Sequence, residues 1–143
     1  MARAYDNLGL CYYYQNQNEL AVKNYEKAIE LGRGSEHPSP WPYLNFAITL
    51  QFLNRLDEAE RNLREALRLD PAFAKAHFQL GTVLEDRKQP EEALKELREA
   101  ARIDPAYPEP HMAMARVLHK LRQEAAAREE TQTYLRLHPH STP

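Results

Sequence analysis

The stretch AKAHFQLGTVLEDRKQPEEALKELREAARIDP, residues 74–105, sets the pattern of the whole chain. Its large and small apolar residues recur when the pattern is shifted by 34 residues in either direction. The prolines that close three successive copies, Pro71, Pro105 and Pro139, are therefore 34 residues apart. A further copy opens the chain, 38 residues ahead of the second. A fixed period of this length is typical of a protein built from repeated supersecondary units.

The four copies resemble the tetratricopeptide repeat (TPR) family over residues 2–139. The resemblance rests on Tyr5-x-x-Leu8-Gly9-x-x-Tyr12, on Ala21, Tyr25 and Ala28 behind it, and on their counterparts in the other copies. It implies an all-α fold, a right-handed α-solenoid of four helix-turn-helix repeats with eight helices. We expect a single domain over residues 1–143, because four repeats exceed the three that a solenoid needs for stability. The expected repeats span about residues 2–35, 40–73, 74–107 and 108–141.

Apolar residues at spacings of three and four predict where the helices run. The expected ranges are residues 2–15, 18–31, 40–53, 56–69, 74–87, 90–103, 108–121 and 124–137. The loop at residues 32–39 is four residues longer than the joint that follows the second repeat. It is either a tolerated surface insertion, since added loop length costs little, or one edge of a binding site. The tail from residue 138 is expected to be disordered.

Small residues recur where the two helices of a repeat are expected to cross. Gly81 holds this position in the third copy, and Ala93 is its partner on the second helix. We expect Gly81→Leu to overpack the crossing and to cost on the order of 1–3 kcal/mol or more. The same argument applies to Gly9, Ala47 and Ala115, to Ala21, Ala59 and Ala127, and to Ala28, Ala66 and Ala100.

The resemblance also implies a site. TPR partners lie in a concave groove lined by the first helix of each repeat, and residues are carried over here by repeat position. The predicted partner-binding groove residues are Tyr13, Tyr14, Trp41, Leu44, Ile48, Phe52, Phe73, Lys75, Phe78, Glu85, Tyr107, Met112 and Arg116. A cluster of aromatics on a surface that need not be buried is typical of a partner site. The alternative, that several of them pack between repeats or beneath the long loop, stays open.

A TPR subfamily binds the C-terminal carboxylate of heat-shock chaperones through five polar residues. The present chain offers only Asn45 and Lys75 at the corresponding positions, and Asp6 would repel a carboxylate. We therefore do not expect this mode of binding.

Other classes of function find little support in the composition. The 19 basic and 21 acidic residues give a net charge of −2 and are spread evenly, which disfavours nucleic-acid binding. No apolar run could span a bilayer and no signal peptide is evident. His77 and His111 share one repeat position and are expected to pack structurally, so we predict no metal site. No nucleotide-binding or hydrolase motif occurs, and we predict no cofactor. Cys11 is the lone cysteine.

The sequence therefore predicts a non-catalytic scaffold that binds a protein or peptide in its groove, and not an enzyme. One alternative is a structural module that self-associates end to end through uncapped repeats. Another is a regulatory segment cut from a larger enzyme, since we expect the chain to be a piece of a longer protein. The sequence says little about localisation and favours the cytoplasm.

Overall fold

The structure is a computed structural model that describes residues 17–138. This part of the chain contains helices and no strand, as an all-α fold requires. The helices belong to two compact units, which divide between Pro71 and Ala72. Each unit is described by itself.

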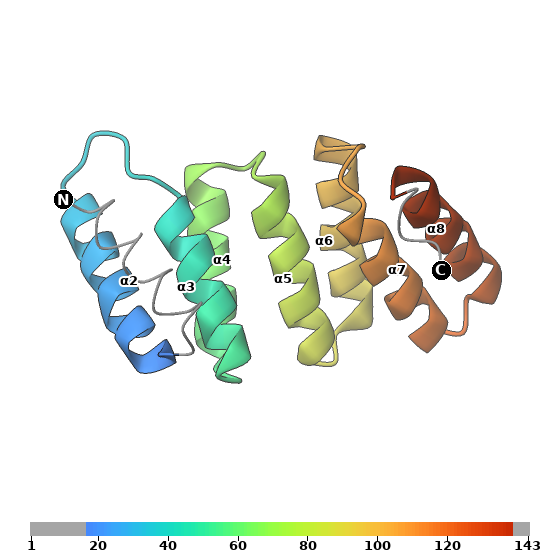
Figure 1. Ribbon diagram of the computed structural model, residues 1–143, viewed down its shortest axis with the longest axis horizontal. Coiled ribbons are helices and arrows are strands. Elements are labelled where there is room, and N and C mark those ends of the chain that lie inside the picture. Colours follow the sequence, from blue (N-terminus) through green and yellow to red (C-terminus); the bar gives the residue numbers. More distant parts are fainter. Residues whose placement is uncertain (1–16, 139–143) are drawn as a thin grey trace. The chain divides into compact units, whose positions relative to one another are not determined.

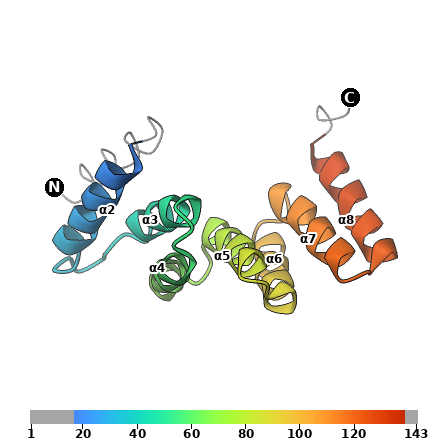
Figure 2. The ribbon, with the colours of Figure 1, turned by 90° about the horizontal axis from the view of Figure 1, so that it is seen from below.

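The first unit contains α2, α3 and α4 (Figures 1 and 2), which span Asn18–Gly32, Trp41–Phe52 and Leu56–Leu69. Helix α3 contacts both α2 and α4, so it lies at the centre of the unit. The rings of Tyr25 and Phe46 join α2 to α3, with centroids 6.1 Å apart. Leu50 on α3 and Leu63 on α4 are fully buried. These side chains form the core of the unit.

The second unit contains α5, α6, α7 and α8 (Figure 1), which span Ala74–Asp86, Pro90–Ile103, Glu109–Lys120 and Glu124–Leu137. Each helix packs on the next, and α5 also contacts α7. Leu80, Leu84, Leu97 and Leu118 form much of its core. The second unit thus repeats one helix-turn-helix arrangement twice.

The predicted helix ranges are confirmed for every described helix, with small differences at the ends. Helices α4, α6 and α8 have the expected bounds, α2 and α5 differ by one residue at one end, and α3 and α7 differ by one residue at each end. The expected helix at 2–15 and the tail beyond residue 138 lie outside the described residues. That residues 1–143 form a single domain remains a prediction.

A repeated turn joins the two helices of each described pair. Asn54, Lys88 and Arg122 have φ values of 60°, 64° and 61°. In the turn after α5, the N–H of Gln89 donates to the Leu84 carbonyl at 2.9 Å, and the turns after α3 and α7 make the matching bond. A residue in the left-handed conformation turns the chain so that N–H groups beyond the helix can donate to its last carbonyls. Glycine is the usual residue at this position. The chain places a lysine and an arginine there at some conformational cost.

The close crossing predicted at Gly81 is confirmed by its surroundings. A Cβ atom added to this glycine would lie 2.7 Å from both Cγ and Cδ2 of Leu97 and 3.3 Å from the Ala93 carbonyl oxygen. The predicted small residues within the described range are all buried, namely Ala21, Ala28, Ala47, Ala59, Ala66, Gly81, Ala93, Ala100, Ala115 and Ala127. Gly9 lies outside that range.

Two histidines link the helices of the second unit. His77 Nδ1 lies 2.8 Å from Glu96 Oε2, and His111 Nδ1 lies 2.6 Å from Glu130 Oε2. Each pair joins the first helix of a repeat to the second, and both rings are mostly buried. Their role is therefore structural. Across residues 17–138 no group of three or more His, Cys, Asp or Glu residues could hold a metal ion, and no helix there is long and apolar enough to cross a membrane.

Candidate functional site

Helix α3 is largely apolar and has no charged residue in its sequence WPYLNFAITLQF, whose amide and threonine side chains are Asn45, Thr49 and Gln51. A helix with this composition is normally buried all round. One face of α3 is indeed buried, since Phe46 and Leu50 pack in the core. Its other face is not, because Trp41 is 45% exposed and Phe52 is 64% exposed.

The exposed residues lie on one stripe of the helix. Trp41, Ile48 and Phe52 are separated by seven and four residues, which places them along the same side at about 100° per residue. Ile48 is half-buried, and Leu44 beside it is buried. We call Trp41, Ile48 and Phe52 the α3 apolar face. Its two aromatic ends lie about 16 Å apart, at 1.5 Å of helix rise per residue.

A charged cluster joins α5 to α7 in the second unit. The side chain of Glu85 is 6% exposed. Arg116 donates to both of its carboxylate oxygens, at 2.7–3.0 Å, and Lys120 Nζ donates to Oε2 at 2.7 Å. Two cations thus meet one carboxylate, and a net charge of +1 remains.

The protonation states in this cluster follow from those contacts. Burial raises the pKa of the Glu85 carboxyl, but the hydrogen bonds and charges of Arg116 and Lys120 outweigh it and hold that pKa below its usual range. The hydrogen bond to Glu85 raises the pKa of Arg116. Glu85 and Arg116 are therefore ionised at neutral pH, and the cluster serves as a structural link between two helices.

Phe78 and Tyr107 form an aromatic contact in the same unit. Their ring centroids lie 5.5 Å apart in an edge-on arrangement. Burial, followed by the charges of Glu109 and Asp104, raises the pKa of Tyr107 to about 12. Both rings are half-buried, so each offers a partner only part of its surface.

The structure divides the predicted groove residues by exposure. Exposed are Trp41, Phe52, Lys75, Met112 and Arg116. Half-buried are Ile48, Phe78 and Tyr107. Buried are Leu44, Phe73 and Glu85, which therefore present little surface to a partner. Tyr13 and Tyr14 lie outside the described residues. That the accessible members bind a partner remains a prediction.

The buried members illustrate why the carry-over by repeat position is incomplete. Leu44 and Phe73 are 3% and 8% exposed, so packing is their evident role. Glu85 was predicted to line the groove, but Arg116 and Lys120 of the same unit already bind it. The accessible charged side chains here are Lys75, which is exposed, and Arg116 and Lys120, which are 49% and 55% exposed.

Comparisons with known proteins agree with the repeat pattern. Three family models, each described as "Tetratricopeptide repeat", match residues 1–72, 44–108 and 84–143. Among solved structures, the chain is similar to residues 41 to the end of MamA from Desulfovibrio magneticus RS-1, with a TM-score of 0.85 and 17% identity over 100% of this chain and 78% of that one. A comparison with curated protein sequences gave no match.

Two further solved structures extend this likeness. PilF from Pseudomonas aeruginosa has a TM-score of 0.84 and 25% identity over 95% of this chain and 60% of that one. YrrB, described as a TPR protein with an unusual peptide-binding site, has a TM-score of 0.81 and 20% identity over 99% of this chain and 71% of that one.

Proposed function

Because the chain belongs to the tetratricopeptide repeat family, we propose that it is a protein-interaction module without catalysis of its own, which holds a peptide or partner helix against the α3 apolar face. The observation that carries this proposal is the exposure of two large aromatic side chains on a helix that has no charged residue. Large apolar side chains that stay exposed along one side of a helix are typical of a place where another molecule binds.

The residues of the α3 apolar face indicate the chemistry of the partner. Trp41 and Phe52 are the large side chains that dominate binding energies when a partner covers them. Because α3 carries no charge, its contribution to affinity comes from apolar contact. A partner helix that lies along α3 would use apolar residues at i, i+3 or i+4 and i+7. An extended segment of about five residues would cover the same 16 Å or so. The described binding of a peptide by YrrB, a protein of similar fold, supports this class of partner.

The test compares two double variants of the full chain. Trp41→Ser with Phe52→Ser removes both aromatic ends of the α3 apolar face. Leu20→Ser with Leu31→Ser, on α2, is the matched control, because these side chains are similarly exposed at 42% and 38%. Both variants are expected to keep the helical circular dichroism, since all four residues are exposed and none belongs to the buried core.

Each protein is immobilised and used to capture partners from a lysate, and the bound proteins are identified by mass spectrometry. Proteins retained by the chain and by the α2 control, and lost from the α3 variant, are the expected result. Equal capture by the two variants would contradict the assignment to α3. Sedimentation of the chain alone checks the self-assembly alternative, because a mass that rises with concentration and falls for the α3 variant would make a second copy the occupant.

A further inference from the structure

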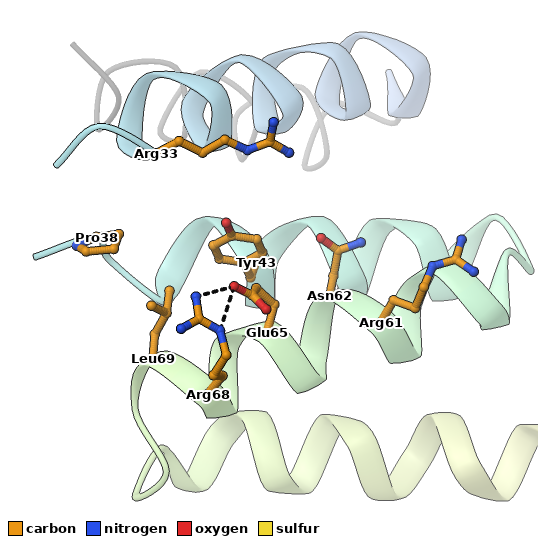
Figure 3. Close-up of a pocket in the computed structure, with 8 residues that line it drawn as sticks. All are labelled: Arg33, Pro38, Tyr43, Arg61, Asn62, Glu65, Arg68 and Leu69. Atoms are coloured by element: carbon orange, nitrogen blue, oxygen red, sulfur yellow. Dashed lines mark hydrogen bonds and ion pairs between the residues drawn. The ribbon is translucent and has the colours of Figure 1, made fainter.

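The first unit contains a half-open hollow of about 420 Å³ that the predicted groove does not include. It lies between the end of α2, the loop that follows α2, and helices α3 and α4 (Figure 3). Figure 3 shows Arg33 on one side of this hollow, with Tyr43, Asn62 and Arg61 on the other. We call it the loop pocket, and its lining residues are Arg33, Pro38, Tyr43, Arg61, Asn62, Glu65, Arg68 and Leu69.

The loop pocket is positively charged in a chain whose net charge is negative. Three arginines and one glutamate line it, which leaves two positive charges. Glu65 pairs with Arg68 at 2.5 Å, so its charge is already neutralised. The side chains of Arg33 and Arg61 make no hydrogen bond or ion pair within residues 17–138. The hydrogen bond of Arg55, and also the charge of Arg61, lower the pKa of the Glu58 carboxyl. Because Arg55 makes both hydrogen bonds to that carboxylate, the guanidinium groups of Arg33 and Arg61 keep their donors for an anion.

A comparison of the repeats shows what is particular to this pocket. Tyr43 and Asn62 stand 19 residues apart, as do His77 and Glu96 in the third repeat and His111 and Glu130 in the fourth. Those two later repeats place a carboxylate at this position and pair it with an imidazole. The second repeat has a phenol and a carboxamide instead. Asn62 in the loop pocket thus lacks the negative charge that Glu96 and Glu130 carry at the same position of the third and fourth repeats.

The long loop at residues 32–39 contributes two walls of the pocket. Arg33 directly follows the last residue of α2, and Pro38 lies near the end of the loop. The sequence left open whether the four additional residues are a plain insertion or one edge of a binding site. Their position around two unpaired arginines favours the second interpretation. This is the signal in the sequence that points to Arg33 and Arg61, which repeat-position reasoning did not select.

We infer that the loop pocket binds an acidic peptide segment, with carboxylates against Arg33 and Arg61. Guanidinium groups bind carboxylates through paired, charge-assisted hydrogen bonds. Arg33 lies in the loop after α2 and Arg61 lies on α4, and Figure 3 shows their guanidinium groups apart, which suits two side chains of a peptide better than a single small anion. Pro38 and Leu69 supply apolar surface for its aliphatic atoms, and the volume falls in the range of about 300–1,000 Å³ that is usual for ligand sites.

The test measures binding of a fluorescein-labelled hexaglutamate peptide to the full chain by fluorescence anisotropy at low ionic strength. Arg33→Gln with Arg61→Gln is expected to weaken binding by about tenfold, at roughly threefold to fivefold for each exposed charge pair. The matched control is Lys27→Gln with Arg98→Gln, which changes the net charge equally with exposed residues outside the pocket. The control is expected to bind within about twofold of the unmodified chain, because distant charges are screened.

A third variant replaces the neutral pair of Tyr43 and Asn62 by the histidine–glutamate pair that the third and fourth repeats have at these positions. Tyr43→His with Asn62→Glu reproduces the imidazole–carboxylate pair of the next two repeats, so the unit is expected to keep its fold, which a thermal melt checks. The added carboxylate should lower the affinity for hexaglutamate about tenfold.

Three outcomes would overturn the inference. The first is equal weakening by the pocket and control variants, which would indicate a nonspecific effect of net charge. The second is undiminished binding by the Tyr43→His, Asn62→Glu variant. The third is displacement of the peptide by millimolar inorganic phosphate, which would indicate a site for any small anion. The inference does not rest on the α3 apolar face, and the Trp41→Ser, Phe52→Ser variant should bind hexaglutamate normally.

Discussion

Replacement of Gly81 by leucine is expected to destabilise the second unit by about 3 kcal/mol, at the upper end of typical overpacking costs. The reason is the crossing of α5 and α6. The first added carbon would already lie 2.7 Å from two carbons of Leu97, well inside the 3.5–4.0 Å of favourable carbon contact. Three more carbons would have to enter a space that Leu97, itself fully buried, already fills.

A graded series separates the steric effect from helix propensity. Gly81→Ala adds one carbon and gains up to about 1 kcal/mol of helix propensity. The second repeat shows that an alanine can be accommodated, because Ala47 and Leu63 occupy the corresponding positions there, and both are fully buried. We therefore expect Gly81→Ala to be within about 1 kcal/mol of neutral, with Leu97 displaced by about 0.8 Å to restore ordinary carbon contact.

Thermal unfolding followed by circular dichroism at 222 nm measures the series. A loss of about 3 kcal/mol corresponds to a fall in Tm of about 10 °C for a chain of this size. Gly34→Leu is the control, because a Cβ added at Gly34 would have no atom within 4 Å. A Tm for Gly81→Leu equal to that of the control would refute the close crossing. A large loss for Gly81→Ala would show that Leu97 cannot move.

The remaining predictions concern the charged cluster and the turns of the second unit. Glu85→Gln is expected to cost about 1–2 kcal/mol at pH 7, less than a fully buried pair, because the side chains of Arg116 and Lys120 are 49% and 55% exposed. The pKa of Glu85 is lower in the folded chain than in the unfolded chain. Ionised Glu85 therefore makes its full contribution to the free energy of unfolding above the unfolded pKa of about 4.3, and this contribution is lost as the pH falls through the folded pKa. Urea titrations at pH 7 and pH 3 should therefore show a larger difference between Glu85→Gln and the unmodified chain at pH 7 than at pH 3, and an equal difference at both would count against an ionised Glu85. Lys88→Gly and Arg122→Gly should each stabilise the chain by about 1 kcal/mol, because both residues have positive φ. A lower urea midpoint for either variant would argue against the left-handed turn.

The positions of the helices could be predicted from the sequence because the information is local. Apolar residues at spacings of three and four define a helix within a few turns. The 34-residue period then predicts the same pair of helices in each copy. The ends of α4, α6 and α8 were predicted on this basis. The small residues at the helix crossings followed for the same reason, since the close packing at Gly81 recurs at the same position in other copies. The left-handed turns were harder, because Lys88 and Arg122 are not residues that favour positive φ.

The sequence by itself determined that this protein is a chain of paired helices with a repeated apolar core, and that Trp41 and Phe52 belong to one helix face. Tertiary structure alone decided which polar residues meet. Glu85 is 31 and 35 residues from Arg116 and Lys120, and no local pattern distinguishes this buried pairing from a charged surface. In the same way, Arg33 and Arg61 line one pocket because a loop brings separate helices together. Burial and ion pairing depend on every neighbour in space, and most of those neighbours are distant in sequence.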